Sequence, residues 1–154
     1  MAVLHKNIDY RMISDSITYN TETDEARFYT RSYIWNNKDE ILTAEQGVYN
    51  NQTKQYSFID KAYIMTETRE IWADTLYYYG VTEDVDMFGN IQIFDKEHSS
   101  YGFGHLGRYW NERGQTLLTR HPSVFTFDKN NDTTFMRADT MFLYVYYPSD
   151  FADS

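Results

Sequence analysis

A glycine-rich loop is the first feature of this sequence that suggests chemistry. Residues Gly102-Phe-Gly-His-Leu-Gly107 match GxGxxG, the spacing that binds the pyrophosphate of a dinucleotide. That motif needs a strand before it and a helix after it, because the helix N-terminus holds the phosphates. The residues that follow, 108–116, continue a pattern of strand and turn. We therefore interpret these glycines as part of a strand rather than as a nucleotide site.

Two patterns raise the possibility of metal binding. Asp128, Asn130 and Asp132 have the spacing that opens a calcium loop, and Asp139 falls at its twelfth position. The sixth position is Thr133, where such a loop needs glycine, so a hairpin turn is the preferred interpretation. No spacing among the histidines suits zinc on one helical face, although Glu97, His98 and His105 would converge if two strands paired. We predict no metal site and no cofactor; the four histidines are His5, His98, His105 and His121.

Paired carboxylates and nucleophiles are the remaining catalytic possibilities. The run Glu83-Asp84-Val85-Asp86 contains neighbouring acids of the kind that cleave glycosides, but such runs are more often solvated turns. No nucleophile elbow is present, and most serines lie in segments rich in turn residues. We predict that the protein is not an enzyme.

Composition indicates which elements hold these residues. The chain has 154 residues, no cysteine and a net charge of −9, yet it contains 15 Tyr, 10 Phe and 3 Trp. A basic footprint for nucleic acid is missing, and no apolar run is long enough to span a membrane. The N-terminus lacks the apolar core of a signal peptide. So many rings among β-branched residues exclude disorder and, with period-two alternation, predict an all-β protein.

Internal repeats support the all-β prediction. A small residue followed by an acidic or polar one recurs about every thirty positions, and a second strand-like segment recurs with nearly the same period. Such a period is typical of proteins built from stacked repeats, in which the first and last repeats leave unpaired strand edges. The first series is Ser14, Ala44, Ala73, Gly104 and Ala138; the second begins at Phe28, Phe58, Met87 and Leu117.

Alternation within the second series predicts a sheet with one apolar face and one charged face. We expect two apolar columns: Phe28, Phe58, Met87 and Leu117 in one, and Ile34, Ile64, Ile93 and Val124 in the other. Arg31, Lys61, Asn90 and Arg120 fall on the opposite face. Turn-rich joints separate the strands at 20–24, 36–40, 50–54, 95–100, 111–114 and 128–132.

The recurring pattern resembles the OstA-like (organic-solvent-tolerance) domain of the lipopolysaccharide-transport bridge. ADTLYYY with MFGNIQI (73–93), AEQGVYN with FIDKAYI (44–64), and ADTMFLY from Ala138 carry the resemblance, which spans about residues 13–147. Gly104-His105 and Thr119-Arg120 depart from it, and Pro122 follows, so the fourth unit is expected to be bulged or opened.

This resemblance implies a β-jellyroll of two facing antiparallel sheets, built from about five repeats of roughly thirty residues. It also implies a periplasmic or outer-membrane location, binding of lipopolysaccharide acyl chains in an apolar trough, and edge-to-edge stacking with other OstA-like modules. We expect a lead-in at 1–12, one domain at 13–147 and a tail at 148–154. The expected lipid-contacting residues are the eight of the two columns: Phe28, Ile34, Phe58, Ile64, Met87, Ile93, Leu117 and Val124.

The aromatic residues leave an alternative open. Exposed rings stack on sugars as readily as they fill a core, and a surface repeat protein or carbohydrate-binding module would use them in this way. Candidates on the outer face are Tyr29, Tyr33, Trp35, Tyr63 and Trp72. A flat exposed aromatic strip over a closed interior would favour this alternative, whereas an open apolar cleft along the strands would favour lipid.

Overall fold

The structure is a computed structural model that describes residues 2–6, 10–36, 38–130 and 132–144. Its regular elements are all strands, with no helix in this part of the chain, so the all-β prediction is confirmed. They are β1 (Ala2–Lys6), β2 (Tyr10–Ser14), β3 (Ile17–Asn20), β4 (Glu25–Phe28), β5 (Ser32–Asn36), β6 (Ile41–Ala44), β7 (Gln46–Asn50), β8 (Gln55–Met65), β9 (Arg69–Tyr79), β10 (Asp84–Asp95), β11 (Ser100–Trp110), β12 (Gln115–Thr119), β13 (Ser123–Phe127), β14 (Thr133–Arg137) and β15 (Thr140–Tyr144).

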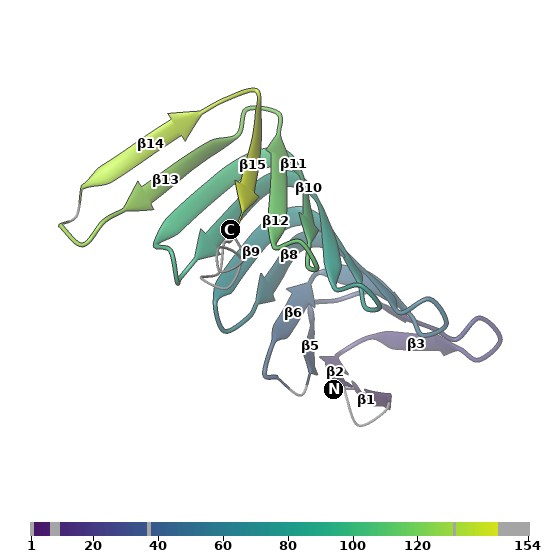
Figure 1. The fold of residues 1–154 in the computed structure, drawn as a ribbon. Helices are drawn as coiled ribbons and strands as arrows, with labels where there is room; N and C mark the ends of the chain where they lie inside the picture. Colours follow the sequence, from purple (N-terminus) through teal and green to yellow (C-terminus); the bar gives the residue numbers. More distant parts are fainter. Residues whose placement is uncertain (1, 7–9, 37, 131, 145–154) are drawn as a thin grey trace, which may run out of the picture.

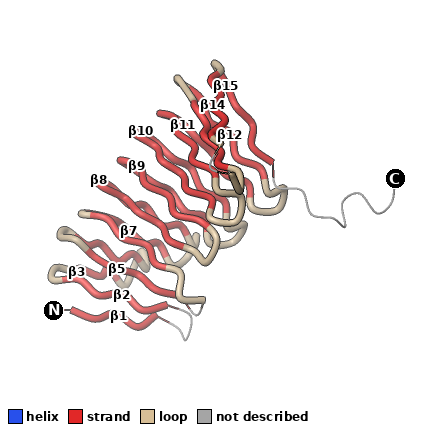
Figure 2. The backbone as a smooth tube through the Cα atoms, turned by 90° about the vertical axis from the view of Figure 1, so that its left-hand side faces the viewer, coloured by secondary structure: helices blue, strands red, loops and turns tan. Residues whose placement is uncertain are grey.

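Every strand pairing in the described chain is antiparallel and joins the strands into one sheet. Four long strands, β8 to β11, form its middle and lie like the rungs of a ladder (Figure 2). Each of the two outer long strands, β8 and β11, pairs along its outer edge with two shorter strands that lie end to end. β6 and β7 pair with opposite halves of β8, and β12 and β13 pair with opposite halves of β11.

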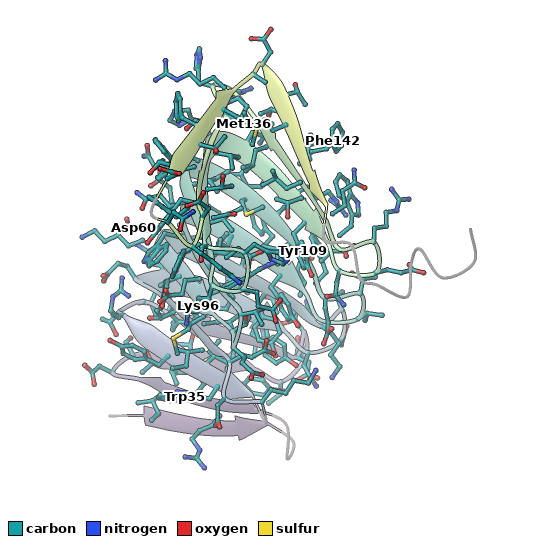
Figure 3. All side chains as sticks on the ribbon, turned by 60° about the vertical axis from the view of Figure 1, so that its left-hand side comes forward. Trp35, Asp60, Lys96, Tyr109, Met136 and Phe142 are labelled. Carbon is teal, nitrogen blue, oxygen red and sulfur yellow. The ribbon has the colours of Figure 1, made fainter. Side chains whose placement is uncertain are left out.

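The sheet is folded along its middle into two wings that face each other as a wedge (Figures 1 and 3). Wing A consists of β3, β4, β7, β12, β15 and the adjoining halves of β8 to β11. Wing B consists of β1, β2, β5, β6, β13, β14 and the other halves of the long strands. Each long strand therefore contributes to both wings.

Left-handed backbone lies at the fold line. Two consecutive residues with positive φ occur at three of the crossings between the wings, and the β8–β9 register shifts between Ile59 and Ala62 at one of them. Such residues interrupt the ladder and turn the strand, as a β-bulge does. At the second crossing, a side chain on Gly89 would also overlap the Asp74 carboxylate, so glycine is required there. The pairs are Asp60 and Lys61, Gly89 and Asn90, and Arg120 and His121.

Hairpin turns form where the sequence predicts them. Asn20, Asn50 and Asp95 each accept hydrogen bonds from two backbone amides of the turn that follows, through Oδ1. Side-chain acceptors of this kind stabilise the turn without a partner strand. The turns return the chain at the outer margins of the wings and keep consecutive strands adjacent.

The core lies between the wings, on the inner face of the sheet. Alternation brings Ala26, Tyr49, Tyr56 and Val85 to this face of wing A, and all four are buried. The matching residues of wing B are aliphatic or small, and they include Met12, Leu42, Ala44, Ala62, Ile71, Ala73 and Ile91. The interior is therefore mostly apolar from β2 to β13, and two of its buried polar residues, Ser14 and Ser32, are joined by a hydrogen bond between their hydroxyls.

One of the two predicted columns contains an error. Phe28, Phe58 and Met87 line the inner face at 2%, 1% and 0% exposure, but Leu118 takes the fourth place at 0%. Leu117 pairs with Arg108 and Phe142 on the outer face. The cause is one extra residue before β12, since the second column, from Ile34 to Val124, is buried as expected.

The N-terminal segment also differs from expectation. Residues 2–6, expected to precede the domain, form β1 and pair with β2 at the edge of the sheet. The segment 148–154 lies outside the described residues.

Candidate functional site

A cleft of about 330 Å³ opens between the two wings on the inner face of the sheet. We call it the trough. Its volume lies at the lower end of the roughly 300–1,000 Å³ range of small-molecule sites. Leu42, Ile64, Ile71, Tyr56, Tyr78, Val85 and Tyr109 form its apolar lining, and Lys38, Glu40, Thr66, Thr68, Arg69, Glu83, Glu97 and Asn111 border it.

Wing A supplies a ladder of rings to the trough. The ring of Tyr56 stacks on that of Tyr49 at 4.3 Å between centroids and lies 5.7 Å from that of Tyr78. Phe58 continues the ladder toward the fold line, at 6.0 Å from Tyr56. Equivalent positions on adjacent strands hold these rings, because paired residues of a sheet point to the same side.

Wing B supplies an aliphatic surface opposite the rings. Leu42, Ile64 and Ile71 are direct cross-strand neighbours on β6, β8 and β9. Each is less than 8% exposed, although all three border the open cleft. Both walls of the trough are therefore apolar, with the aliphatic side chains of wing B facing the aromatic rings of wing A.

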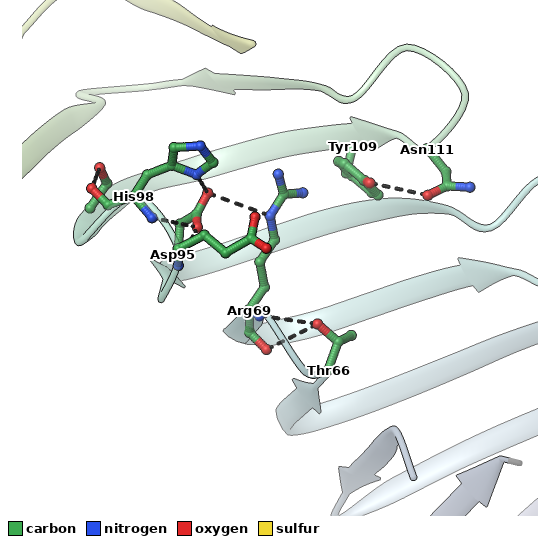
Figure 4. Close-up of polar contacts among 8 residues, drawn as sticks. Thr66, Arg69, Asp95, His98, Tyr109 and Asn111 are labelled. Atoms are coloured by element: carbon green, nitrogen blue, oxygen red, sulfur yellow. Dashed lines mark hydrogen bonds and ion pairs between the residues drawn. The ribbon is translucent and has the colours of Figure 1, made fainter. Parts of the chain in front are cut away.

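A cation–π contact joins the wings across the mouth of the trough. The Arg69 guanidinium, from wing B, lies 5.0 Å from the centre of the Tyr109 ring in wing A. A tight turn fixes the start of β9, because the Arg69 amide donates to the Thr66 hydroxyl at 3.1 Å and the Thr66 amide donates to the Arg69 carbonyl at 2.8 Å. Tyr109 donates its hydroxyl to Asn111 Oδ1 at 3.1 Å (Figure 4).

Asp95 holds the cation in place. Its Oδ2 lies 3.8 Å from Arg69 Nε and 2.9 Å from His98 Nδ1 (Figure 4). The border of the trough otherwise mixes Lys38 with Glu40, Glu83 and Glu97. Mixed charges of this kind form a polar margin around an apolar interior.

The eight expected residues occupy three environments. Ile64 lines the trough, and Leu117 lies on the outer face. The remaining six are buried at 8% exposure or less in the closed core: Phe28, Ile34, Phe58, Met87, Ile93 and Val124. Sequence reasoning missed Tyr56, Tyr78 and Tyr109, because it followed only the columns nearest the fold line. The signal that was available is the recurrence of tyrosine near the turn-proximal end of successive strand-like segments.

The motifs that suggested other chemistry have structural positions. Gly102 to Gly107 lie within β11, so the helix that a dinucleotide site needs does not follow them. Asp128 Oδ1 accepts the backbone amides of Asn130 and Asp132, both at 2.8 Å, within the β13–β14 turn. In the part of the chain that the structure describes, no three acidic, histidine or cysteine side chains cluster as metal ligands. No helix there has the length and apolar character to cross a membrane.

One antiparallel sheet folded into two wings around an apolar trough defines the class of proteins with the OstA-like fold. The sequence matches no family profile and no curated protein. Among solved structures the chain is similar to LptH, the LptA-homologous periplasmic component of the lipopolysaccharide transport device from Pseudomonas aeruginosa. The TM-score is 0.65 over 82% of this chain and 93% of LptH, at 11% identity. The likeness confirms the resemblance at the level of the fold.

Proposed function

We propose that this protein is a non-enzymatic module that binds lipopolysaccharide acyl chains in its trough and transports them in the periplasm. The observation that carries this proposal is the open cleft with aliphatic and aromatic walls and a charged margin. Burial of an acyl chain is favourable by about 0.8 kcal/mol per methylene. The likeness to LptH supports the glycolipid as the ligand and the periplasm as the compartment.

The apolar lining is the source of affinity in this proposal. The trough border carries two cations, Lys38 and Arg69, against three glutamates, so it offers no net positive charge to an anionic headgroup. Binding of the acyl chain is therefore expected to depend little on ionic strength, since screening acts on charge pairs and not on apolar burial. We further propose that Ile64 contacts lipid directly and that the six buried column residues do so only where the wings spread.

Photo-crosslinking tests the trough. A diazirine analogue of leucine at Ile64 or Ile71 should label with purified lipopolysaccharide, because both border the cleft. Ile59 is the matched control, as an isoleucine 40% exposed outside the trough. Equal labelling at Ile59 and Ile64, or no labelling at either trough position, would contradict the proposal.

Free strand edges support a second part of the proposal, stacking of modules into a bridge. Among described residues, β14 pairs only with β13 and β15 only with β12, so both are edge strands. They expose Phe135, Met136 and Phe142 at 46%, 47% and 51% (Figure 3 labels the last two). Exposed edges with apolar side chains accept another strand. Light scattering over a concentration series should show reversible growth that Met136→Lys suppresses.

The architecture within this proposal is a β-jellyroll of about five thirty-residue repeats forming one domain from β1 to β15. The spacing of the fold-line residues supports this, since Asp60, Gly89 and Arg120 recur with a period of about thirty positions. Each repeat then corresponds to one excursion of the chain from one wing to the other and back, along two successive strands.

A further inference from the structure

A second hollow lies outside the trough, on the outer face of wing B beside the fold line. It measures about 380 Å³, and its lining combines two aromatic rings with four polar side chains. We call it the outer site; its six functional side chains are Arg31, Lys61, Tyr63, Trp72, Asp74 and Asn90.

Two rings form a platform in the outer site. Tyr63 and Trp72 are cross-strand partners on β8 and β9, with centroids 5.1 Å apart and planes 31° from each other. Trp72 remains 37% exposed. The Tyr63 hydroxyl donates to Glu70, which holds the phenol ring in position. Trp72 is therefore a partly exposed indole supported by the Tyr63 ring, and an exposed aromatic surface of this kind favours contact with C–H groups.

Four polar side chains border this platform, and hydrogen bonds or ion pairs hold three of them, Arg31, Asp74 and Asn90. Asn90 Nδ2 donates to Asp74 Oδ2 at 3.0 Å, which leaves Asp74 Oδ1 outside that bond. The Asp74 carboxylate rests against Gly89, where a Cβ would overlap it. On the other side, Arg31 is held by Glu45 at 2.8 Å and by the Lys61 carbonyl at 3.2 Å. The exposed Lys61 side chain adds a further donor.

A ring platform with carboxylate, amide and ammonium groups at its margin matches the chemistry of a sugar. A pyranose has an apolar C–H face and a rim of hydroxyls that both donate and accept hydrogen bonds. An acyl chain would displace water from Asp74 Oδ1 and from the Lys61 ammonium and offer neither a hydrogen-bond partner, which costs free energy. We propose that the outer site binds a pyranose ring of an oligosaccharide, with the sugar on Trp72 and its hydroxyls toward Asp74, Asn90 and Lys61.

This site is separate from the trough. Trp72 and Tyr63 alternate with Ile71 and Ile64, so the sheet lies between the outer site and the cleft. A lipid with its acyl chain in the trough therefore does not place its nearest sugar on Trp72. The proposal goes beyond the proposed function and does not depend on it.

Nuclear magnetic resonance on the whole chain provides the test. The protein would be titrated with maltohexaose and, separately, with lipid-free core oligosaccharide released from lipopolysaccharide by mild acid. With either probe, the Trp72 indole N–H should shift saturably with a Kd on the order of 1 mM, equivalent to about −4 kcal/mol. The Trp35 and Trp110 indoles are internal controls, because neither borders the outer site.

Three variants make the test specific. Asp74→Asn, followed at the Trp72 indole, and Trp72→Ala, followed at the backbone amides of Tyr63 and Asp74, should each weaken binding at least about fivefold, a loss of about 1 kcal/mol. Trp110→Phe, on the outer face of wing A, should leave the affinity unchanged. If Trp72→Ala does not fold, Asp74→Asn still tests the proposal, provided that its spectrum is that of a folded protein. No saturable shift at Trp72 with either probe, or unchanged affinity in Asp74→Asn and Trp72→Ala, would overturn the proposal. The lipid labelling described above reports on the trough alone, so the two failures are distinguishable.

Discussion

The Arg69 guanidinium lies 5.0 Å from the centre of the Tyr109 ring, and this contact ties wing B to wing A at the mouth of the trough. The two residues are far apart in the chain and lie on β9 and β11, with β10 between them in the sheet. Only the folding of the sheet brings them face to face. Asp95 anchors the arginine from the same wing.

A double-mutant cycle on this contact should give a coupling energy of about 0.5–1 kcal/mol, typical of a cation–π pair. Arg69→Ala and Tyr109→Leu, alone and combined, would be compared by urea unfolding. Arg69→Ala should also increase lipid labelling at Ile64, because the mouth loses its bridge. The matched control is Arg113→Ala, whose guanidinium lies 5.9 Å from the Trp110 ring, away from the lining of the trough. Equal labelling in the two arginine variants would contradict a bridging role.

The neighbouring leucines of β12 should differ sharply in their effect on stability. Leu118→Ala removes a side chain that is 0% exposed and should cost about 2–5 kcal/mol of unfolding free energy. Leu117→Ala, on the outer face beside Arg108, should cost less than about 1 kcal/mol. Chemical denaturation measures both. Similar losses would show that β12 pairs in another register.

Gly47 should not tolerate a side chain. A Cβ there would overlap the Phe28 ring and lie 2.5 Å from the Ser57 carbonyl oxygen, and backbone cannot move aside cheaply. Gly47→Ala should therefore destabilise the fold by about 1–3 kcal/mol. Gly102→Ala is the control, because its nearest neighbour would be the end of the Leu118 side chain at 3.2 Å. A thermal melt of the two variants compares them directly.

Tyr63 should be among the last phenols to ionise. Burial, followed by the hydrogen bond and the charge of Glu70, raises its pKa from 10.0 to about 12. The folded protein keeps this proton between pH 10 and 12 while the unfolded chain loses it, so the contribution to stability is complete below pH 10 and disappears as the pH rises toward 12. The phenolate absorbance of Tyr63→Phe should lack a late step present in the parent. Tyr79→Phe is an informative comparison, because burial and Asp86 also raise the pKa of Tyr79.

Local patterns in the sequence predict much of the fold. Period-two alternation yields the inner and outer faces, and the thirty-residue recurrence corresponds to successive crossings of the wedge. Asn20 and Asn50 sit at equivalent positions of two such passages and form the same turn. The misplacement of Leu117 shows where the reasoning failed. In each correctly assigned crossing, the two inner-face residues that flank the fold line, such as Phe58 and Ile64, have the same separation in the sequence. Leu118 and Val124 also have this separation, whereas Leu117 and Val124 do not.

The candidate sites were less accessible to such reasoning. Ile64 was expected in the trough, but Tyr78 and Tyr109 were not, because nothing local distinguishes a ring at an open margin from one in a closed core. Tyr63 and Trp72 were recognised as outer-face rings. Their joint position beside Asp74 and Asn90 depends on the bend at Gly89, which alternation does not encode.

The sequence by itself determined that this chain is a β-protein whose strands have one apolar face, because strand propensity, alternation and turn residues act over a few neighbouring positions. Only the tertiary structure decided that the sheet folds on itself, that a trough remains open between the wings, and that Arg69 meets Tyr109 across it. Those features depend on the angle between two wings. That angle results from packing and backbone conformation summed over many strands, and no single segment carries it.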